Sequence, residues 1–369
     1  MTAHPDILVV GLGPAGAAAA KAAAEAGFRV LAIDRRRRAG EPVQCAEFVP
    51  RMLGADHRAV SLAGIQPITR METYLENLGV EVTPDFQGVM IDRAAFDTAL
   101  VAEAEAAGAE VRFGTLLRSL DAEGALLGDR TRITPKLIIG ADGPRSPVGA
   151  ASGIRNRELC ETRQITVPLN TPHEATDIFL NAEIEGGYAW LFPRGEVANL
   201  GLGLRPEAKA LLKPVLERLH DQLADAGRVG REVLRTTGGA IPVGGIVGPV
   251  GSLAEIPVLL AGDAAGLTNP VTGAGISAAV VSGELAATAA ADWLKGKTDA
   301  LDDYAEEIDD LFGGSLRLGL ARRRALLETY CGGNRPDAAD LRAGWIAYPE
   351  YWTRTATEAV ETRLGRHEP

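Results

Sequence analysis

Three glycines near the beginning of the sequence have the spacing of a turn that holds a dinucleotide. Gly11, Gly13 and Gly16 form a G-x-G-x-x-G pattern. The first permits a tight turn, the second lets the backbone approach a pyrophosphate, and the third lets a helix pack closely on a strand. Asp34 follows at the separation at which a carboxylate accepts hydrogen bonds from ribose hydroxyls. The residues expected around this dinucleotide are Gly11, Gly13, Pro14, Ala15, Gly16, Asp34 and Arg35.

The elements that must position these residues are a strand, a helix and a second strand. Residues 7–10 and 30–33 are apolar, and residues 17–26 are rich in alanine, which favours helix. The pattern predicts a βαβ unit whose helix N-terminus faces the pyrophosphate. It does not distinguish FAD from NAD.

Two later segments repeat the sequence of apolar strand and glycine-containing turn. Residues 136–153 lead from a strand into a turn with Asp142 and Gly143. Residues 258–287 lead from a strand through Gly262 and Asp263 into a glycine-rich loop and a helix of small residues. Each segment by itself is an ordinary strand and turn, so it is their order after the first motif that carries information.

The three motifs together resemble the flavoprotein superfamily with the p-hydroxybenzoate hydroxylase type of fold. The resemblance implies that FAD binds non-covalently. Gly262 and Asp263 would lie beside the ribitol, and the loop that leads into the last helix would lie beside the pyrimidine edge of the flavin. The N-terminus of the last helix would stabilise negative charge on a reduced flavin. The resemblance adds these residues to the expected FAD site: Arg93, Ala141, Asp142, Gly143, Gly262, Asp263, Gly273, Ala274, Gly275 and Ile276. Cys45 and Ala46, in the turn after the second strand, are expected at the cofactor as well.

A second nucleotide-binding unit is not expected. The closest pattern, GLGLRP at residues 201–206, lacks the third glycine and follows a strand rather than opening a helix. If NAD(P)H is the electron donor, we expect it to bind transiently and to leave after hydride transfer.

Three aromatic residues alternate along residues 188–192 in a chain with only 5% aromatic residues. Tyr188, Trp190 and Phe192 would lie on one face of a strand that Pro193 ends. With Cys45, Ala46 and Glu47 upstream, the YAWLFP segment resembles the geranylgeranyl reductase family. That resemblance implies that the three rings line a substrate cavity before the flavin. The resemblance and the residue chemistry make Trp190 a candidate catalytic residue. They also leave three candidate proton donors, namely Cys45, Glu47 and Tyr188.

The leading hypothesis is therefore an FAD-dependent oxidoreductase that takes electrons from NAD(P)H or another donor and reduces a double bond of an isoprenoid or other small apolar substrate. A second hypothesis is electron relay to a protein redox partner, for example a lipoate-synthase-type enzyme. Third is a flavin monooxygenase or halogenase. A non-catalytic prenyl-protein escort comes last, because the flavin motifs are intact.

Composition excludes other classes of partner. With 49 acidic and 38 basic residues the net charge is −11, which predicts no nucleic-acid binding. Three cysteines without CxxC spacing predict no metal site and fit a reducing cytoplasm. We expect no signal peptide and no transmembrane segment, while weak contact with a membrane surface remains compatible with the composition.

The predicted fold is α/β with a Rossmann-like FAD-binding domain. We expect that domain to be discontinuous, formed by residues 1–50, 85–155 and 250–298. Residues 51–84 and 156–249 are expected to form an α+β substrate domain with an antiparallel sheet. Residues 299–369 are expected to form a helical C-terminal region.

Overall fold

The first apolar segment forms a central strand of a six-stranded sheet. A computed structural model describes residues 4–51 and 58–353 of the chain. In this sheet the strand order is β19-β20-β12-β1-β2-β8, and all neighbours are parallel except β19 and β20. Its strands are β1 (Ile7–Val10), β2 (Val30–Ile33), β8 (Glu110–Arg112), β12 (Leu137–Gly140), β19 (Val250–Leu253) and β20 (Ile256–Leu260). The carboxyl ends of β1, β12 and β20 bring the three glycine-containing turns together, as the doubly wound topology requires.

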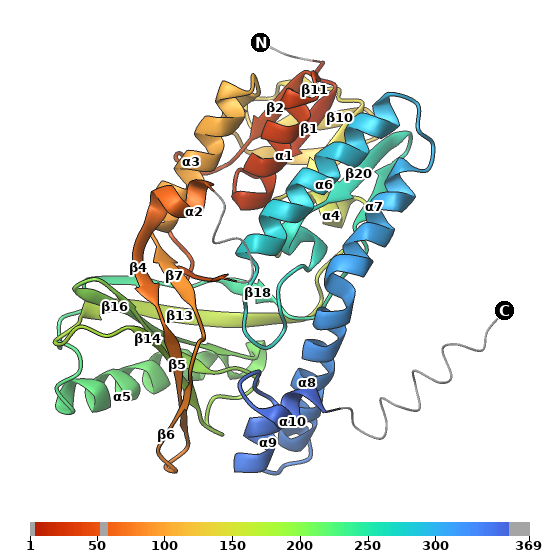
Figure 1. The fold of residues 1–369 in the computed structure, drawn as a ribbon. Coiled ribbons are helices and arrows are strands. Elements are labelled where there is room, and N and C mark those ends of the chain that lie inside the picture. Colours follow the sequence, from red (N-terminus) through yellow and green to blue (C-terminus); the bar gives the residue numbers. More distant parts are fainter. Residues whose placement is uncertain (1–3, 52–57, 354–369) are drawn as a thin grey trace.

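Helices rich in small residues cover this sheet. The helices packed around it are α1 (Pro14–Glu25), α3 (Arg93–Ala106), α4 (Pro147–Ala151), α6 (Ile276–Leu294) and α7 (Ala300–Ile308). α1 and α6 lie side by side (Figure 1), and a Cβ added at Gly283 would lie 2.1 Å from the Ala15 carbonyl oxygen. The absence of a side chain at Gly283 therefore sets how closely these two helices approach.

A second, larger sheet has the order β17-β13-β16-β15-β14-β5-β6, with β18 paired to β13. Its strands are β5 (Arg70–Leu75), β6 (Val80–Thr83), β13 (Leu159–Pro168), β14 (Ala175–Leu180), β15 (Ala189–Arg194), β16 (Val197–Leu204), β17 (Arg235–Thr237) and β18 (Ala240–Pro242). It is antiparallel, as expected, except that β5 and β14 are parallel. The long intervening segment, which contributes β8 and β12 to the six-stranded sheet, allows this parallel pairing, because parallel strands need a long connection.

Two small sheets and several further helices complete the fold. β3 (Phe48–Pro50), β7 (Gly88–Ile91) and β4 (Gly64–Ile68) form one three-stranded sheet, and β9 (Leu117–Asp121), β10 (Gly124–Leu127) and β11 (Arg132–Ile133) form another. The remaining helices are α2 (Arg58–Ala63), α5 (Leu212–Asp225), α8 (Gly314–Cys331), α9 (Ala338–Ala343) and α10 (Pro349–Trp352), with short turns of 3-10 or π helix at Pro206–Leu211, Gly262–Ala265 and Asp309–Gly313. The predicted ranges for the substrate domain and the C-terminal region include residues 52–57 and 354–369, which lie outside the described residues.

The two faces of the larger sheet bury different cores. One face packs against α5 through Leu191, Leu200 and Leu202. The opposite face carries Trp190 and Phe192, and the C-terminal segment around α9 covers them with Trp345 and Tyr348. α8 extends from the six-stranded sheet to this C-terminal segment (Figure 1). Within residues 4–51 and 58–353, none of the helices has both the length and the apolar character needed to cross a bilayer.

Candidate functional site

Of the three glycines in the first turn, one has room for a side chain and two do not. A Cβ at Gly11, which has φ +96°, would lie 2.3 Å from the Ala141 oxygen, and one at Gly16 would lie 1.8 Å from the Gly11 oxygen. At Gly13 the nearest atom would be Nη2 of Arg36 at 3.9 Å. The fold itself therefore requires Gly11 and Gly16, whereas Gly13 leaves free space at the beginning of α1. That space is where a pyrophosphate fits.

Two helices begin at this site without a side-chain cap among the described residues. The N-cap residues are Gly13 for α1 and Gly275 for α6. By contrast, Asp92 and Asp337 cap α3 and α9 through their carboxylates. The first N–H groups of α1 and α6 thus remain available to an anionic ligand, and the helix dipole favours one. The two ends fit a pyrophosphate and a reduced flavin ring.

Asp34 lies at the end of β2, buried and well supplied with donors. Its carboxylate accepts from the Leu12 N–H at 2.8 Å and the Arg36 N–H at 2.7 Å, and the Arg36 guanidinium reaches it at 2.7 Å. Burial opposes ionisation, but Arg36 and the backbone donors outweigh it and lower the pKa of Asp34. Arg35, which is also expected at the cofactor site, is exposed, and its charge acts on Asp142. The sequence alone does not show which of the four consecutive arginines, residues 35–38, contacts Asp34.

The Gly262 turn packs directly against the first motif. Gly262 has φ +60°, and a Cβ there would lie 3.1 Å from the Cβ of Ala15. Its N–H donates to Oγ of Ser282 at 2.9 Å. Asp263 is accompanied by Thr268, whose hydroxyl donates to its carboxylate at 2.7 Å. Burial raises the pKa of Asp263, opposed by that hydrogen bond and by the charge of Arg93.

Ala141, Asp142 and Gly143 follow β12 at the same edge of the sheet. The Asp142 carboxylate accepts from the Ser146 hydroxyl and, at 2.9 Å, from the Val148 N–H. Burial raises its pKa. Asp142 therefore holds the start of α4 in place, and Gly143, with φ +87°, has no atom within 4 Å of its added Cβ.

Glu47 is fully enclosed rather than solvated. The residue has φ +70° and is 1% exposed. One carboxylate oxygen accepts from the Arg93 N–H at 3.0 Å, and the other accepts from Nδ2 of Asn199 at 2.9 Å. Arg194 and Arg235 lie 3.5 and 3.6 Å from the same oxygen. Both oxygens are thus engaged, which suits holding the turn in position.

Cys45 and Arg93 lie beside Glu47. The Cys45 sulfur accepts from the Glu47 N–H at 3.2 Å. Arg93 is the first residue of α3, and its guanidinium donates to Asp97 at 2.7 Å. Burial opposes the charge of Arg93, but the Asp97 carboxylate and the neighbouring Cys45 outweigh it and raise its pKa. The structure therefore brings Cys45, Ala46, Glu47 and Arg93 together at the boundary of the two sheets.

A chain of hydrogen bonds connects this turn to the aromatic strand. Nε1 of Trp190 donates to Oε1 of Gln164 at 3.0 Å, and Nε2 of Gln164 donates to the Cys45 carbonyl at 3.1 Å. The Tyr188 hydroxyl donates to the Thr272 carbonyl at 2.6 Å, in the loop before α6. Both aromatic residues are thereby tied to segments that flank the expected flavin.

The three aromatic rings share one face, as predicted, although β15 itself begins at Ala189. Pro193 does not end the strand, because β15 continues to Arg194 and pairs with β16 through both residues. The Tyr188 and Trp190 centroids are 5.6 Å apart, and those of Trp190 and Phe192 are 6.3 Å apart. Trp190 lies over Gly201 of the neighbouring strand, where a Cβ would meet the indole at 2.5 Å. Burial strongly raises the pKa of Tyr188. Trp345 packs on Tyr188 at 4.7 Å, so the aromatic face is covered in this structure.

Sequence reasoning missed the residues that connect these segments. Gln164 and Asn199 occupy inward positions of β13 and β16 and are 3% and 0% exposed. The single polar amide in the otherwise apolar β16 is a signal that could have found Asn199, because such a group is buried only with partners. β13 mixes polar and apolar residues, so Gln164 gave no such signal. Trp345 gave no signal, since nothing in its local sequence indicates which face it covers.

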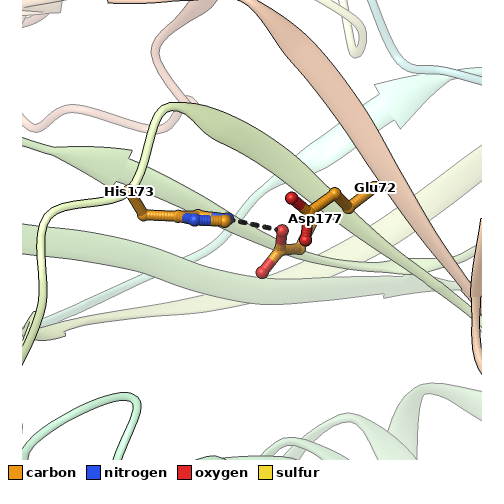
Figure 2. Close-up of side chains that lie close together, drawn as sticks. All are labelled: Glu72, His173 and Asp177. Carbon is orange, nitrogen blue, oxygen red and sulfur yellow. Dashed lines mark hydrogen bonds and ion pairs between the residues drawn. The ribbon is translucent and has the colours of Figure 1, made fainter. Parts of the chain in front are cut away.

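A separate polar cluster lies on the α5 side of the larger sheet (Figure 2). His173 Nε2 and Asp177 Oδ1 are 2.7 Å apart, with Glu72 beside them. Arg70 pairs with Glu72 at 2.9 Å, and Arg228 pairs with Asp177. These two guanidinium groups balance both carboxylates, so we interpret the cluster as an ion-pair network rather than a metal centre.

Comparison with known proteins agrees with this geometry. A model of the FAD binding domain family matches residues 4–191, and a model of the geranylgeranyl reductase catalytic domain matches residues 159–241. Digeranylgeranylglycerophospholipid reductase 2 of Methanopyrus kandleri is 34% identical over 88% of this chain and 87% of its own. The corresponding reductase of Methanocella arvoryzae is 33% identical over 86% of each chain.

Solved structures share the fold. A geranylgeranyl bacteriochlorophyll reductase-like protein of Thermoplasma acidophilum superposes with a TM-score of 0.80 at 23% identity, covering 99% of this chain and 96% of its own. A probable FAD-dependent monooxygenase of Pseudomonas aeruginosa superposes with a TM-score of 0.69 at 20% identity, covering 89% and 99%. From the matched residues and the identity across most of its length, this chain belongs to the geranylgeranyl reductase family of FAD-dependent oxidoreductases.

Proposed function

We propose that this protein reduces carbon–carbon double bonds of an isoprenoid chain carried by a polar lipid. The observation that carries the proposal is the aromatic face of β15, which the Trp190–Gln164–Cys45 hydrogen bonds fix to the expected flavin boundary. The names of the relatives, which describe them as reductases of a digeranylgeranyl phospholipid, support the same substrate class. Bound FAD supplies two-electron hydride chemistry.

In this proposal the chain's own residues bind, orient and protonate. Gly13 and the uncapped ends of α1 and α6 receive the anionic parts of the cofactor. Trp190 and Phe192 hold the alkene and exclude water. Tyr188 keeps its proton because burial raises its pKa, and Cys45 is near enough to act on Tyr188 electrostatically. With the two-electron chemistry that bound FAD would supply, one of these groups would give its proton to an alkene carbon.

The aromatic face must open for an isoprenoid chain to bind. The cavity beside Tyr188 measures about 30 Å³, whereas pockets for ligands of this size hold roughly 300–1,000 Å³. Because Trp345 closes the face, we propose that the segment around α9 moves aside when the lipid enters.

The small cavity also favours a second candidate, electron relay from the flavin to a protein partner. Such a partner needs no tunnel for an alkyl chain. In either case we propose that NAD(P)H is a transient electron donor. We also propose that the two large sheets mark the two domains. The three free cysteines suit a reducing cytoplasm, where we propose that the protein acts.

The test uses FAD-loaded protein reduced anaerobically with dithionite. A lipid bearing geranylgeranyl chains is added, and products are analysed by mass spectrometry. The proposal expects a gain of two hydrogen atoms per reduced double bond together with reoxidation of the flavin. Reduced flavin that persists for hours beside unaltered lipid would overturn it and leave electron relay as the function to examine.

A further inference from the structure

The small cavity beside Tyr188 lies where three elements meet. The beginning of β15, helix α8 and the segment around α9 enclose it, and α8 and α9 converge at this end of the molecule (Figure 1). Its lining includes Leu180, Tyr188, Arg323, Leu326, Leu341 and Trp345. Most of these side chains are apolar, so the polar groups of Arg323 and Trp345 stand out.

Both of these residues carry a buried N–H group without an acceptor among the described residues. Arg323 is 6% exposed and Trp345 is 3% exposed. Nε of Arg323 and Nε1 of Trp345 have no hydrogen-bond partner in the part of the chain that the structure describes. A buried donor without an acceptor costs roughly 1–3 kcal/mol. Two such donors beside one cavity indicate that something with acceptor oxygens belongs there.

The charge of Arg323 is also left without a paired carboxylate. Its guanidinium donates to the Gly186 carbonyl, and no acidic oxygen among the described residues lies within the distance of an ion pair. The Cys160 thiol lies beside the guanidinium, but burial raises the pKa of that thiol to about 11, so it stays protonated. Glu158 also acts on Arg323, but it pairs with the adjacent Arg324 at 2.6 Å. Burial lowers the pKa of Arg323. A cation held in this way gains from an anion that enters the cavity.

We propose that Arg323 and Trp345 form a subsite for the phosphate ester or diphosphate oxygens of the substrate. As it stands, the cavity has the volume of about one water molecule, so it admits one oxygen and leaves the rest of the group outside. The apolar side chains of Leu180, Leu326 and Leu341 line the same cavity and pack in the core that contains the aromatic face. Once the segment around α9 has shifted off Tyr188, with Trp345 still beside Arg323, an amphiphile would place its polar end at Arg323 and its hydrocarbon chain along Tyr188 and Trp190. This inference rests on the proposed function for the identity of the ligand.

The test compares two ligands with the same chain and different ends. Geranylgeranyl diphosphate and geranylgeraniol are titrated calorimetrically into FAD-loaded, oxidised protein, in which no turnover occurs. Arg323→Met removes the charge and the guanidinium donors and keeps an unbranched apolar stem, and Trp345→Phe removes the indole N–H and leaves a smaller apolar ring. Arg324→Met, at an exposed neighbouring position, is the matched control.

We expect Arg323→Met to weaken diphosphate binding by about 10- to 100-fold, as the loss of a charge-assisted contact of roughly 1.5–3 kcal/mol gives. Trp345→Phe should weaken it by about 5-fold, and geranylgeraniol binding should change by less than about 2-fold in both variants. Arg324→Met should bind both ligands as the unaltered protein does.

Three results would overturn the subsite. These are equal losses for both ligands, equal losses in Arg324→Met, or an unaltered protein that binds the alcohol as tightly as the diphosphate. Melting temperature and flavin content are checked for each variant. If Arg323→Met does not fold, Trp345→Phe and the ligand preference of the unaltered protein decide the question. Selective diphosphate binding without any alkene reduction would overturn the proposed reaction and retain the subsite.

Discussion

Trp190 and Gln164 form a buried hydrogen-bonded pair, with the indole Nε1 donating to Oε1 of the amide at 3.0 Å. Gln164 also donates to the Cys45 carbonyl at 3.1 Å. A single amide therefore fixes the aromatic face relative to the turn after β2. We regard Gln164 as a positioning residue, because it contacts neither the expected flavin ring nor the alkene in the proposed arrangement.

Gln164→Leu should leave the Trp190 N–H and the Cys45 carbonyl unpaired. We expect a loss of about 1–3 kcal/mol in the free energy of unfolding and slower transfer to the acceptor, with flavin reduction unaltered. Gln164→Glu keeps an acceptor for Trp190 but loses the donor to Cys45. Its rate of transfer to the acceptor should therefore lie between those of the unaltered protein and Gln164→Leu. The measurement is a pair of half-reactions by stopped flow. A Leu variant with both half-reactions intact would remove any positioning role.

Gly13 offers an unusually direct test of FAD binding. A Cβ there meets no protein atom closer than 3.9 Å, so Gly13→Ala should leave the stability of the cofactor-free protein nearly unaltered. If the pyrophosphate approaches this backbone, the same change weakens FAD binding, and Gly13→Val weakens it further. Gly314→Ala, at an exposed helix start with an equally open Cβ position, serves as control. Equal FAD affinity in Gly13→Val and the control would exclude a pyrophosphate at this turn.

Asp34 predicts how stability responds to acid. Its pKa is lower in the folded protein than the ordinary value of about 3.9, so its contribution to stability is fully present above that value. It is lost only as the pH falls through the lower folded pKa. The melting temperatures of the unaltered protein and Asp34→Asn should therefore differ by a constant amount from pH 8 to about pH 5 and converge below about pH 4. A difference that already shrinks near pH 6 would contradict the lowered pKa.

Trp190 should also contribute strongly to stability. It is 6% exposed and packs on Gly201 and Phe192, so Trp190→Ala should cost about 3–5 kcal/mol. Trp190→Phe keeps most of the packing and removes the hydrogen bond to Gln164. Denaturant unfolding separates the two contributions. A cost below about 1 kcal/mol for the Ala variant would show that the ring faces an open cavity instead.

The electron donor can be tested independently of the acceptor. Anaerobic mixing with NADH or NADPH should bleach the flavin without forming a stable nicotinamide complex. Each nicotinamide is mixed separately, and dithionite serves as the positive control. Bleaching by dithionite or reduced ferredoxin alone would replace the nicotinamide with another donor and leave the flavin assignment intact.

The sequence predicted the features that depend on residues close together in the chain. The turn at Gly11 and the alternation of Tyr188, Trp190 and Phe192 follow from a few adjacent residues, and the structure has both. The placement of Gln164 against Cys45 could not be predicted in this way, because it depends on how two sheets meet. The burial of Glu47 depends in the same way on Asn199 and Arg93 from distant strands and helices.

The parallel pairing of β5 with β14 has a consequence for how the chain folds during synthesis. Arg70 pairs with Ala175, so the hairpin of β5 and β6 leaves the ribosome well before its partner strand exists. At 5–20 residues per second, the open edge of β5 waits on the order of 5–20 s for β14. During that interval its unpaired N–H and C=O groups are available to any other extended chain. Slow translation of residues 76–174 should therefore raise the fraction of nascent protein that aggregates, whereas a chaperone that shields this edge should lower it.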